Sequence, residues 1–439
     1  MKTKIILLAV MTFLCHLSFS QNIDIKKLDT YFETLETNNK FMGSVAISGK
    51  GKIIYEKSVG YADIETGQKL NENFKFRIGS ITKTFTTVLV LKAVEEKRIA
   101  LEQTIETYFP TITNAEKITL NHLLYHKSGI FNFTNDENFL DWHTETKTKK
   151  EIIELISQGG SNFEPGKKSE YSNSNFVLLT YILEEIYEKS YSDLLNEKIV
   201  KPLGLNNTYL GNEINIANNE CYSYTFEGKW IKSPEFNSSI SNGAGAIVST
   251  PADLTIFSDA LFKGKLISKK SLAQMKTLNG SFGMGLIRMP YYEKIGLGHG
   301  GTVDGFRSIF VHFEKEKISV AITSNALNYN LNNISIAILG CIFDDSIEIP
   351  DFTTYKIASE DLDMYTGNYI NEKYSLIIDI TKKDDSLFGQ MKGQPSFYIE
   401  ATEKDKFESD LFGVVMEFNI PEKTLILKQN GQRIVFIKD

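Results

Sequence analysis

A serine and a lysine three positions apart are the first residues whose chemistry stands out. They are Ser80 and Lys83 in the segment Ser-Ile-Thr-Lys, directly after Gly79. Positions i and i+3 of a helix share a face, so the hydroxyl and the amine can meet. A serine hydroxyl needs a neighbouring base to act as a nucleophile. Lys83 can be that base if burial or the positive field of a helix N-terminus destabilises its charged form.

A tyrosine and an asparagine form the second motif. Tyr171 and Asn173 stand in Tyr-Ser-Asn, after the turn Pro165–Gly166 and before an apolar helical pattern. A phenol near the serine can share the general-base work if the lysine lowers its pKa. The amide of Asn173 can orient a substrate carbonyl and hold the lysine.

The third motif is His299-Gly300-Gly301, followed by Thr302 at the start of a predicted strand. Two glycines allow a backbone to approach a ligand closely. The N–H of Thr302 is therefore expected to be one oxyanion donor, opposite the N–H of Ser80 at the start of its helix. We expect all four residues of this segment to contribute to substrate binding.

In this order the three motifs resemble those of the active-site serine penicillin-recognising superfamily. The branch that looks most similar holds the class C β-lactamases with their D-peptidase and esterase relatives. That family has Ser-x-x-Lys, then Tyr-x-Asn, then Lys-Thr-Gly or His-x-Gly on the strand beside the site. Three further stretches match it, namely Leu123–Ile130, Gly243–Gly245 and Ser249–Leu254. The resemblance covers residues 25 to 345.

The resemblance implies a reaction and a set of roles. Ser80 attacks a carbonyl and forms an acyl-enzyme, while Lys83 and Tyr171 exchange its proton. Asn173 holds the substrate amide, the backbone amides of Ser80 and Thr302 bind the oxyanion, and water releases the acyl group. The substrates it implies are D-amino-acyl peptides, amides or esters, with no cofactor and no metal.

The third motif departs from the lactamase form. His299 and Gly300 stand where class C lactamases usually have lysine and threonine, which removes a permanent cation and a hydroxyl. Histidine is only partly charged near neutral pH. His-x-Gly looks more like the D-amino-acid peptidases and esterases of the group. Two alternatives stay open, a genuine β-lactamase and a non-catalytic protein that binds or senses peptidoglycan fragments.

The predicted fold class is α+β, with an antiparallel sheet flanked by helices and interrupted by a large helical insert. Alternating runs predict hairpins over 44–58 and 308–324, and helical spacing predicts helices over 25–37, 176–187 and 334–343. Residues 21–349 are expected to form this domain. Residues 356–439 read as strands, with Asn430-Gly431 as a hairpin turn, and predict a small β-barrel-like domain.

Charge and the N-terminus indicate the compartment. Lys2 and Lys4 precede the apolar run Ile5–Phe19, so residues 1–20 read as a signal peptide cleaved near Ser20/Gln21. The net charge of the 439 residues is −7, and removal of the two lysines leaves 46 basic against 55 acidic residues, or −9. Such a chain disfavours nucleic acid. We expect an exported, periplasmic or secreted protein without a transmembrane segment in the mature chain, and the sequence indicates no particular oligomeric state.

The cysteines and a histidine pair leave smaller questions. Cys221 and Cys341 could form a disulfide or stay as two buried thiols. His122 and His126 have the i, i+4 spacing of a metal clamp, but no third ligand is evident. A structural role beside Gly129, an expected helix C-cap, is favoured instead.

Overall fold

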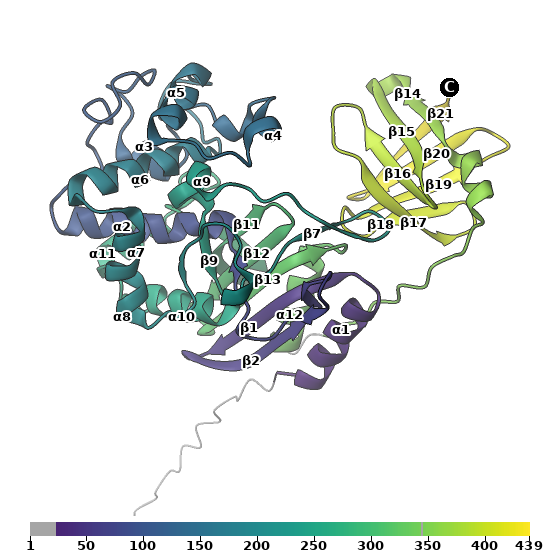
Figure 1. Ribbon diagram of the computed structural model, residues 1–439, viewed down its shortest axis with the longest axis horizontal. Coiled ribbons are helices and arrows are strands. Elements are labelled where there is room, and N and C mark those ends of the chain that lie inside the picture. Colours follow the sequence, from purple (N-terminus) through teal and green to yellow (C-terminus); the bar gives the residue numbers. More distant parts are fainter. Residues whose placement is uncertain (1–22, 344–345) are drawn as a thin grey trace, which may run out of the picture.

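The central sheet joins the two ends of the larger domain. The structure is a computed structural model that describes residues 23–343 and 346–439, so the predicted signal peptide lies outside the described residues. The main strands run in the order β10-β11-β12-β13-β1-β2 (Figure 1). Their bounds are Ile287–Tyr291 for β10, Lys294–Val303 for β11, Phe306–Phe313 for β12, Ile318–Leu327 for β13, Phe41–Gly49 for β1 and Lys52–Val59 for β2. Both predicted hairpins are present, and β1 pairs antiparallel with β13, as expected for a sheet completed from both ends.

Helices cover both faces of this sheet. On one face α1 (Ile25–Thr37) and α12 (Leu331–Phe343) bury their apolar sides against Val45 and Ile47. On the other face α10 (Pro251–Phe262) and the helical insert pack against Phe310 and Ala321. Alternate residues of a strand point to opposite faces, so the near-continuous burial of β1 follows from a sheet covered on both sides.

The insert supplies the remaining helices. The helix predicted to begin at Ser80 opens with one 3-10 turn, η1 (Gly79–Ile81), and continues as α2 (Thr82–Glu95). The helix predicted over 176–187 is present as α6, which begins earlier and spans Asn173–Tyr187. The others are α3 (Leu120–Leu124), α4 (Phe139–Trp142), α5 (Lys149–Gly159), α7 (Tyr191–Leu195), α8 (Lys201–Leu203), α9 (Ser238–Gly245) and α11 (Lys269–Lys276). Short strands connect them, namely β3 (Tyr61–Asp63), β4 (Gln68–Lys69), β5 (Phe76–Arg77), β6 (Tyr209–Leu210), β7 (Tyr224–Phe226), β8 (Trp230–Lys232) and β9 (Ile247–Ser249).

The C-terminal part is a closed barrel of eight strands, β14 to β21, which confirms the predicted all-β architecture (Figure 1). The strands are β14 (Gly367–Asn371), β15 (Leu376–Lys383), β16 (Ser386–Met391), β17 (Phe397–Glu403), β18 (Lys406–Ser409), β19 (Val414–Asn419), β20 (Thr424–Gln429) and β21 (Gln432–Lys438). Asn430 and Gly431 both have positive φ, as the predicted two-residue turn between β20 and β21 requires. Apolar side chains such as Tyr369, Met416 and Phe436 form the barrel's core.

The two cysteines and the helices settle two sequence questions. Cys221 and Cys341 are both buried and free, so the chain takes the second of the two alternatives. The Sγ of Cys221 donates to the carbonyl oxygen of Lys75 at 3.3 Å. Of the helices in the described ranges, none combines the length and hydrophobicity needed to cross a bilayer.

Lys40 holds the barrel against the larger domain. Its side chain is only 5% exposed, and its Nζ lies 3.0 Å from Glu400 and 2.9 Å from Asp410, both in the barrel. Burial alone would lower the pKa of Lys40, but the two carboxylates raise it above the ordinary value. The amine therefore stays charged and pairs with two acids at the domain boundary.

We expect Lys40→Ala to destabilise the protein, because it leaves two partly buried carboxylates facing each other without a cation. The loss should be about 3 kcal/mol, the lower end for breaking a buried pair, since each carboxylate keeps some contact with water. Urea unfolding measures it. Lys26→Ala, at an exposed lysine of α1, is the matched control and should leave the midpoint unchanged. Equal midpoints for the two variants would contradict this role for Lys40.

Candidate active site

Two glycines bring the serine segment against β11. Gly79 has φ +50°, which L side chains rarely adopt, and a Cβ there would lie 2.8 Å from the backbone N of Thr302. A Cβ on Gly301 would overlap the carbonyl oxygen of Ile78. The start of η1 and the end of β11 can approach this closely only because both positions lack a side chain. The backbone amides of Ser80 and Thr302 are thereby brought to the same place.

Ser80 Oγ is held by two side chains from different segments. Lys83 Nζ lies 3.0 Å away on the next turn, and Tyr171 OH lies 2.6 Å away, in the segment two positions before α6. The first two sequence motifs, 91 positions apart, therefore meet at one oxygen atom.

Lys83 is fully buried, and burial lowers its pKa well below the ordinary value. Besides Ser80, its Nζ contacts Asn173 Oδ1 and the carbonyl oxygen of Ala244, each at 2.7 Å. These two oxygens can only accept, so they take the two N–H groups of a neutral amine. The nitrogen lone pair is then left for the hydroxyl proton of Ser80, which is the arrangement a general base needs.

The amide of Asn173 is oriented by a chain of hydrogen bonds. Its Nδ2 donates to Thr134 Oγ1 at 2.9 Å, and Thr134 in turn donates to Asn132 Oδ1 at 3.1 Å. Asn132 Oδ1 also accepts from the backbone N of Asn173 at 2.9 Å. Because the amide nitrogen of Asn173 donates to Thr134, the amide oxygen is the atom that faces Lys83 and accepts a hydrogen bond from it.

The phenol of Tyr171 also has a shifted pKa. Burial raises its pKa above the ordinary value, more than the hydrogen bond to Ser80 lowers it. The condition under which Tyr171 would share the general-base work, a pKa lowered by Lys83, is therefore not met, because the buried amine is itself poorly able to hold a charge. Tyr171 can donate its proton to Ser80 Oγ, while Ser80 gives its own to Lys83.

His126 supports the phenol from behind. Its ring stacks on Tyr171 at 4.5 Å between centroids, and its Nδ1 accepts from the backbone N of Ser172 at 3.1 Å. Burial lowers the pKa of His126 well below the ordinary value, so the ring is neutral. His122 is engaged elsewhere, because its Nδ1 accepts from the backbone N of Thr119 in the cap of α3. Within the described residues, no group of His, Cys, Asp and Glu could hold a metal.

His299 lies beneath the site. Its side chain is 5% exposed, and its Nδ1 lies 2.6 Å from the carbonyl oxygen of Gly300, to which it can donate. Burial, and next the charge of Lys83, lowers the pKa of His299 to about 4. The ring is thus neutral at neutral pH, and it is not among the side chains that line the cavity beside Ser80.

That cavity has a volume of about 380 Å³ and one apolar wall. Of the predicted residues, Ser80, Asn173 and Thr302 line it, whereas Gly300 and Gly301 do not; Lys83 and Tyr171 contact Ser80 Oγ from outside the lining. The apolar wall consists of Phe133, Phe139, Leu140, Phe236 and Val303. The rest of the lining is Thr134, His143, Ser241, Ala244, Gly245 and Asp304.

Sequence reasoning missed this wall. The sequence suggests a surface position for His143, but its ring packs against Phe139 at 6.0 Å and Phe236 at 6.4 Å beside the cavity. Nothing in their spacing marks these aromatic residues, since they come from segments about a hundred positions apart. Of these residues, only Asp304 lies close to a predicted motif in the sequence, two positions after Thr302. Burial raises its pKa to about 6, against the opposing effects of the Phe236 amide and Arg77.

Comparisons with known proteins agree with this geometry. A family profile described as "Beta-lactamase" matches residues 28–337. Penicillin-binding protein 4* of Bacillus subtilis (strain 168) is 24% identical over 92% of this chain and 97% of its own length. Teichoic acid D-alanine hydrolase of Staphylococcus aureus (strain MRSA252) is 30% identical over a matched region that covers 57% of this chain and 61% of that protein.

Solved structures give the same result. A D-amino acid amidase from Ochrobactrum anthropi SV3, complexed with L-phenylalanine, has a TM-score of 0.66 at 26% identity, over 73% of this chain and 99% of its own. The octameric penicillin-binding protein homologue from Pyrococcus abyssi shares the fold over 94% of this chain and all of its own, with a TM-score of 0.66 at 23% identity. The profile covers well over half of the chain, so the chain belongs to the β-lactamase family of serine hydrolases.

Proposed function

We propose that the protein is an exported serine hydrolase that forms an acyl-enzyme on Ser80 and cleaves D-amino-acyl amides, esters or peptides. One observation carries the proposal: Ser80 Oγ lies 3.0 Å from Lys83 Nζ and 2.6 Å from Tyr171 OH. A buried neutral amine, a phenol and a serine hydroxyl in contact are the parts that nucleophilic acyl transfer needs.

The proposed reaction follows from these contacts. Ser80 Oγ bonds to the substrate carbonyl carbon while its proton passes to the lone pair of Lys83. The carbonyl oxygen becomes an oxyanion, which the backbone N–H groups of Ser80 and Thr302 stabilise. Tyr171 then gives a proton to the leaving nitrogen or oxygen, and the ammonium of Lys83 replaces it. Water attacks the ester of Ser80 by the reverse route and releases the acid.

The cavity supports a small D-amino-acyl group. Its volume of about 380 Å³ is that of a small-molecule site, and the wall that includes Phe139 and Phe236 suits an apolar side chain. The carboxylate of Asp304 lines the same cavity and is a partner for an α-ammonium group. Two of the relatives are named a teichoic acid D-alanine hydrolase and a D-amino acid amidase.

Rapid β-lactam hydrolysis is a weaker alternative. The buried, neutral ring of His299 offers no cation to the carboxylate of a lactam. We expect penicillins to acylate Ser80 without fast turnover. A protein that only binds peptidoglycan fragments would have no use for a deprotonated lysine beside a serine, so we do not favour that alternative.

Export rests on the sequence pattern of residues 1–20. The lysines at the start, the apolar run and the small residues before Gln21 are typical of a signal peptide. We propose that the working protein begins near Gln21 in the periplasm or outside the cell, where envelope polymers offer D-amino-acyl groups.

The nucleophile can be tested by intact-mass spectrometry after treatment with a fluorophosphonate or a penicillin. We expect one adduct with each reagent, because both acylate or phosphonylate an activated serine. Ser80→Ala should abolish both adducts, and Ser192→Ala, at an exposed serine, should keep them. An adduct that survives in Ser80→Ala would refute the assignment, and an adduct with fluorophosphonate alone would indicate an esterase or amidase.

The base can be tested by the pH dependence of kcat/KM. A lysine acts as base only when neutral, so activity should rise with pH through the lowered pKa of Lys83 and level off far below pH 10, where exposed lysines titrate. Tyr171→Phe should lower the plateau by about 100- to 10,000-fold, as for loss of a general acid–base group. The acidic limb should stay in place in that variant; a limb that disappears with Tyr171 would assign the base to the phenol instead.

The substrate class can be tested with D- and L-phenylalanine amide and with the two alanine amides. We expect kcat/KM to favour the D-enantiomers. Phe139→Ala should reduce the preference for phenylalanine over alanine by about tenfold, as for lost contacts in an apolar pocket. Tyr292→Ala, at an 80% exposed aromatic residue outside this cavity, is the control and should have little effect. Equal rates for D and L forms would overturn the D-acyl assignment while leaving Ser80 as the nucleophile.

A further inference from the structure

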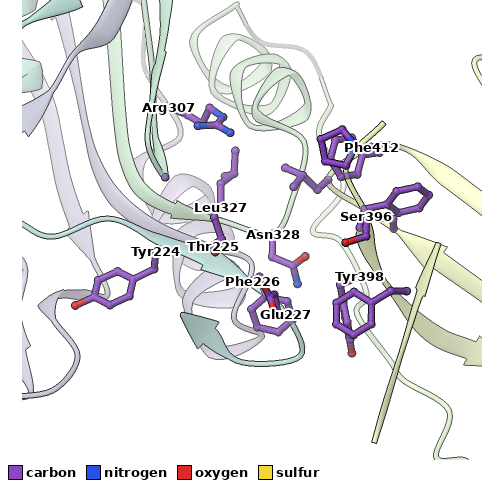
Figure 2. A pocket seen from close by; sticks show the side chains of 16 residues that line it. Tyr224, Thr225, Phe226, Glu227, Arg307, Leu327, Asn328, Ser396, Tyr398 and Phe412 are labelled. Carbon is purple, nitrogen blue, oxygen red and sulfur yellow. The ribbon is translucent and has the colours of Figure 1, made fainter. Parts of the chain in front are cut away.

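A second cavity lies between the two domains. It has a volume of about 370 Å³, within the range of small-molecule sites. The larger domain contributes β7 and the ends of β12 and β13, and the barrel contributes the segment before β17 and the end of β18 (Figure 2). Figure 2 shows Asn328 between the β7 residues on one side and Ser396 and Tyr398 on the other.

Arg307 brings a positive charge to this cavity. Its Nη1 donates to the carbonyl oxygens of Asp304 at 3.0 Å and Phe306 at 2.8 Å. Burial lowers the pKa of Arg307, which marks a guanidinium that is poorly hydrated. The charge of Asp304 acts on this half-buried guanidinium, but no carboxylate in the described ranges lies within ion-pair distance of it.

Glu227, the one acidic residue among those that line the cavity, does not pair with Arg307. Glu227 is already paired with Lys383 of the barrel, with Oε2 and Nζ 2.6 Å apart. Its charge is neutralised by that lysine. The unpaired charge that remains in the lining is therefore the positive charge of Arg307.

Two neutral side chains in the lining also lack partners. Asn328 is 7% exposed and Ser409 is 5% exposed. Within the part of the chain that the structure describes, neither the carboxamide of Asn328 nor the hydroxyl of Ser409 makes a hydrogen bond, and both residues line the cavity. These polar atoms are not among the fully buried ones that lack a partner, so they keep some contact with solvent in the cavity, and a ligand can supply hydrogen bonds in place of that water.

Aromatic side chains form much of the remaining lining. Phe226 and Tyr398 meet edge to face across the domain boundary at 5.1 Å, and Phe397 packs on Phe412 at 5.3 Å. Aromatic faces accept apolar ligand surface, and they exclude water from a charge beside them. The cavity thus combines one unpaired cation, two free hydrogen-bonding groups and an apolar wall.

We propose that this interdomain cavity binds a small organic anion with an apolar body, its charged group on Arg307 and within reach of Asn328 and Ser409. Guanidinium groups bind carboxylates and similar anions through paired N–H donors. The site is separate from the catalytic cavity, but the two share one turn. Thr302 and Asp304 line the catalytic side, and Gly305 and Arg307 line the other. The proposal does not depend on which substrate Ser80 attacks.

The test uses two dyes that fluoresce in apolar pockets. Anilinonaphthalene sulfonate carries a negative charge, and N-phenyl-1-naphthylamine is its uncharged counterpart. With the full chain we expect saturable binding of the anionic dye at a single site. Arg307→Gln should weaken it about tenfold or more, as for loss of a charge-assisted contact. Binding of the neutral dye should change little, and Arg433→Gln, at an exposed arginine of the barrel, should affect neither.

A second variant and a blocked enzyme make the test decisive. Ser396→Trp adds bulk at the exposed rim of the cavity and should abolish binding of both dyes without disturbing the core. Protein whose Ser80 has reacted with fluorophosphonate, and the Ser80→Ala variant, should bind the anionic dye as the wild type does. Wild-type affinity in Arg307→Gln or Ser396→Trp, or loss of binding after fluorophosphonate treatment, would overturn the proposal. These outcomes are independent of whether any substrate is hydrolysed.

Discussion

The burial of one amine governs the rest of the site. Lys83 sits inside the protein, and no carboxylate among the described residues forms an ion pair with it, so the charged form is unfavourable and the neutral form can act as a base. Its two N–H groups need two fixed acceptors, which come from α6 and from the segment that contains Ala244. Two separate parts of the insert must therefore pack against α2, and the apolar core that surrounds this helix makes that packing possible.

The same burial explains the state of the neighbouring groups. Tyr171, His126 and His299 all lie in the poorly solvated space around Lys83, and each is held in its uncharged form. In the described part of the chain no charged side chain forms a hydrogen bond with Ser80 Oγ other than the amine of Lys83, so the proposed oxyanion relies on the backbone amides that the glycine contacts bring together. Asp304 lines the same cavity and faces Arg77 at 3.6 Å.

The C-terminal barrel is joined to the larger domain by a few polar and aromatic contacts. It is attached by ion pairs at Lys40 and Lys383 and by the contact of Phe226 with Tyr398. These contacts leave a cavity whose lining includes the unpaired Arg307. The turn from β11 to β12 borders both cavities, so the two domains meet close to the catalytic strand.

Neighbours along the chain determine the local helices, strands and turns and the types of reactive residue in each motif. The spacing of Ser80 and Lys83, the alternation in both hairpins and the Asn430-Gly431 turn each depend on neighbours along the chain, and the structure has them where they were predicted. Tertiary structure decided the raised pKa of Tyr171, the position of His299 beneath the site, the aromatic wall and the cavity beside the barrel. Burial and pKa depend on which distant segments surround a group, and periodicity along the chain carries no information about those neighbours.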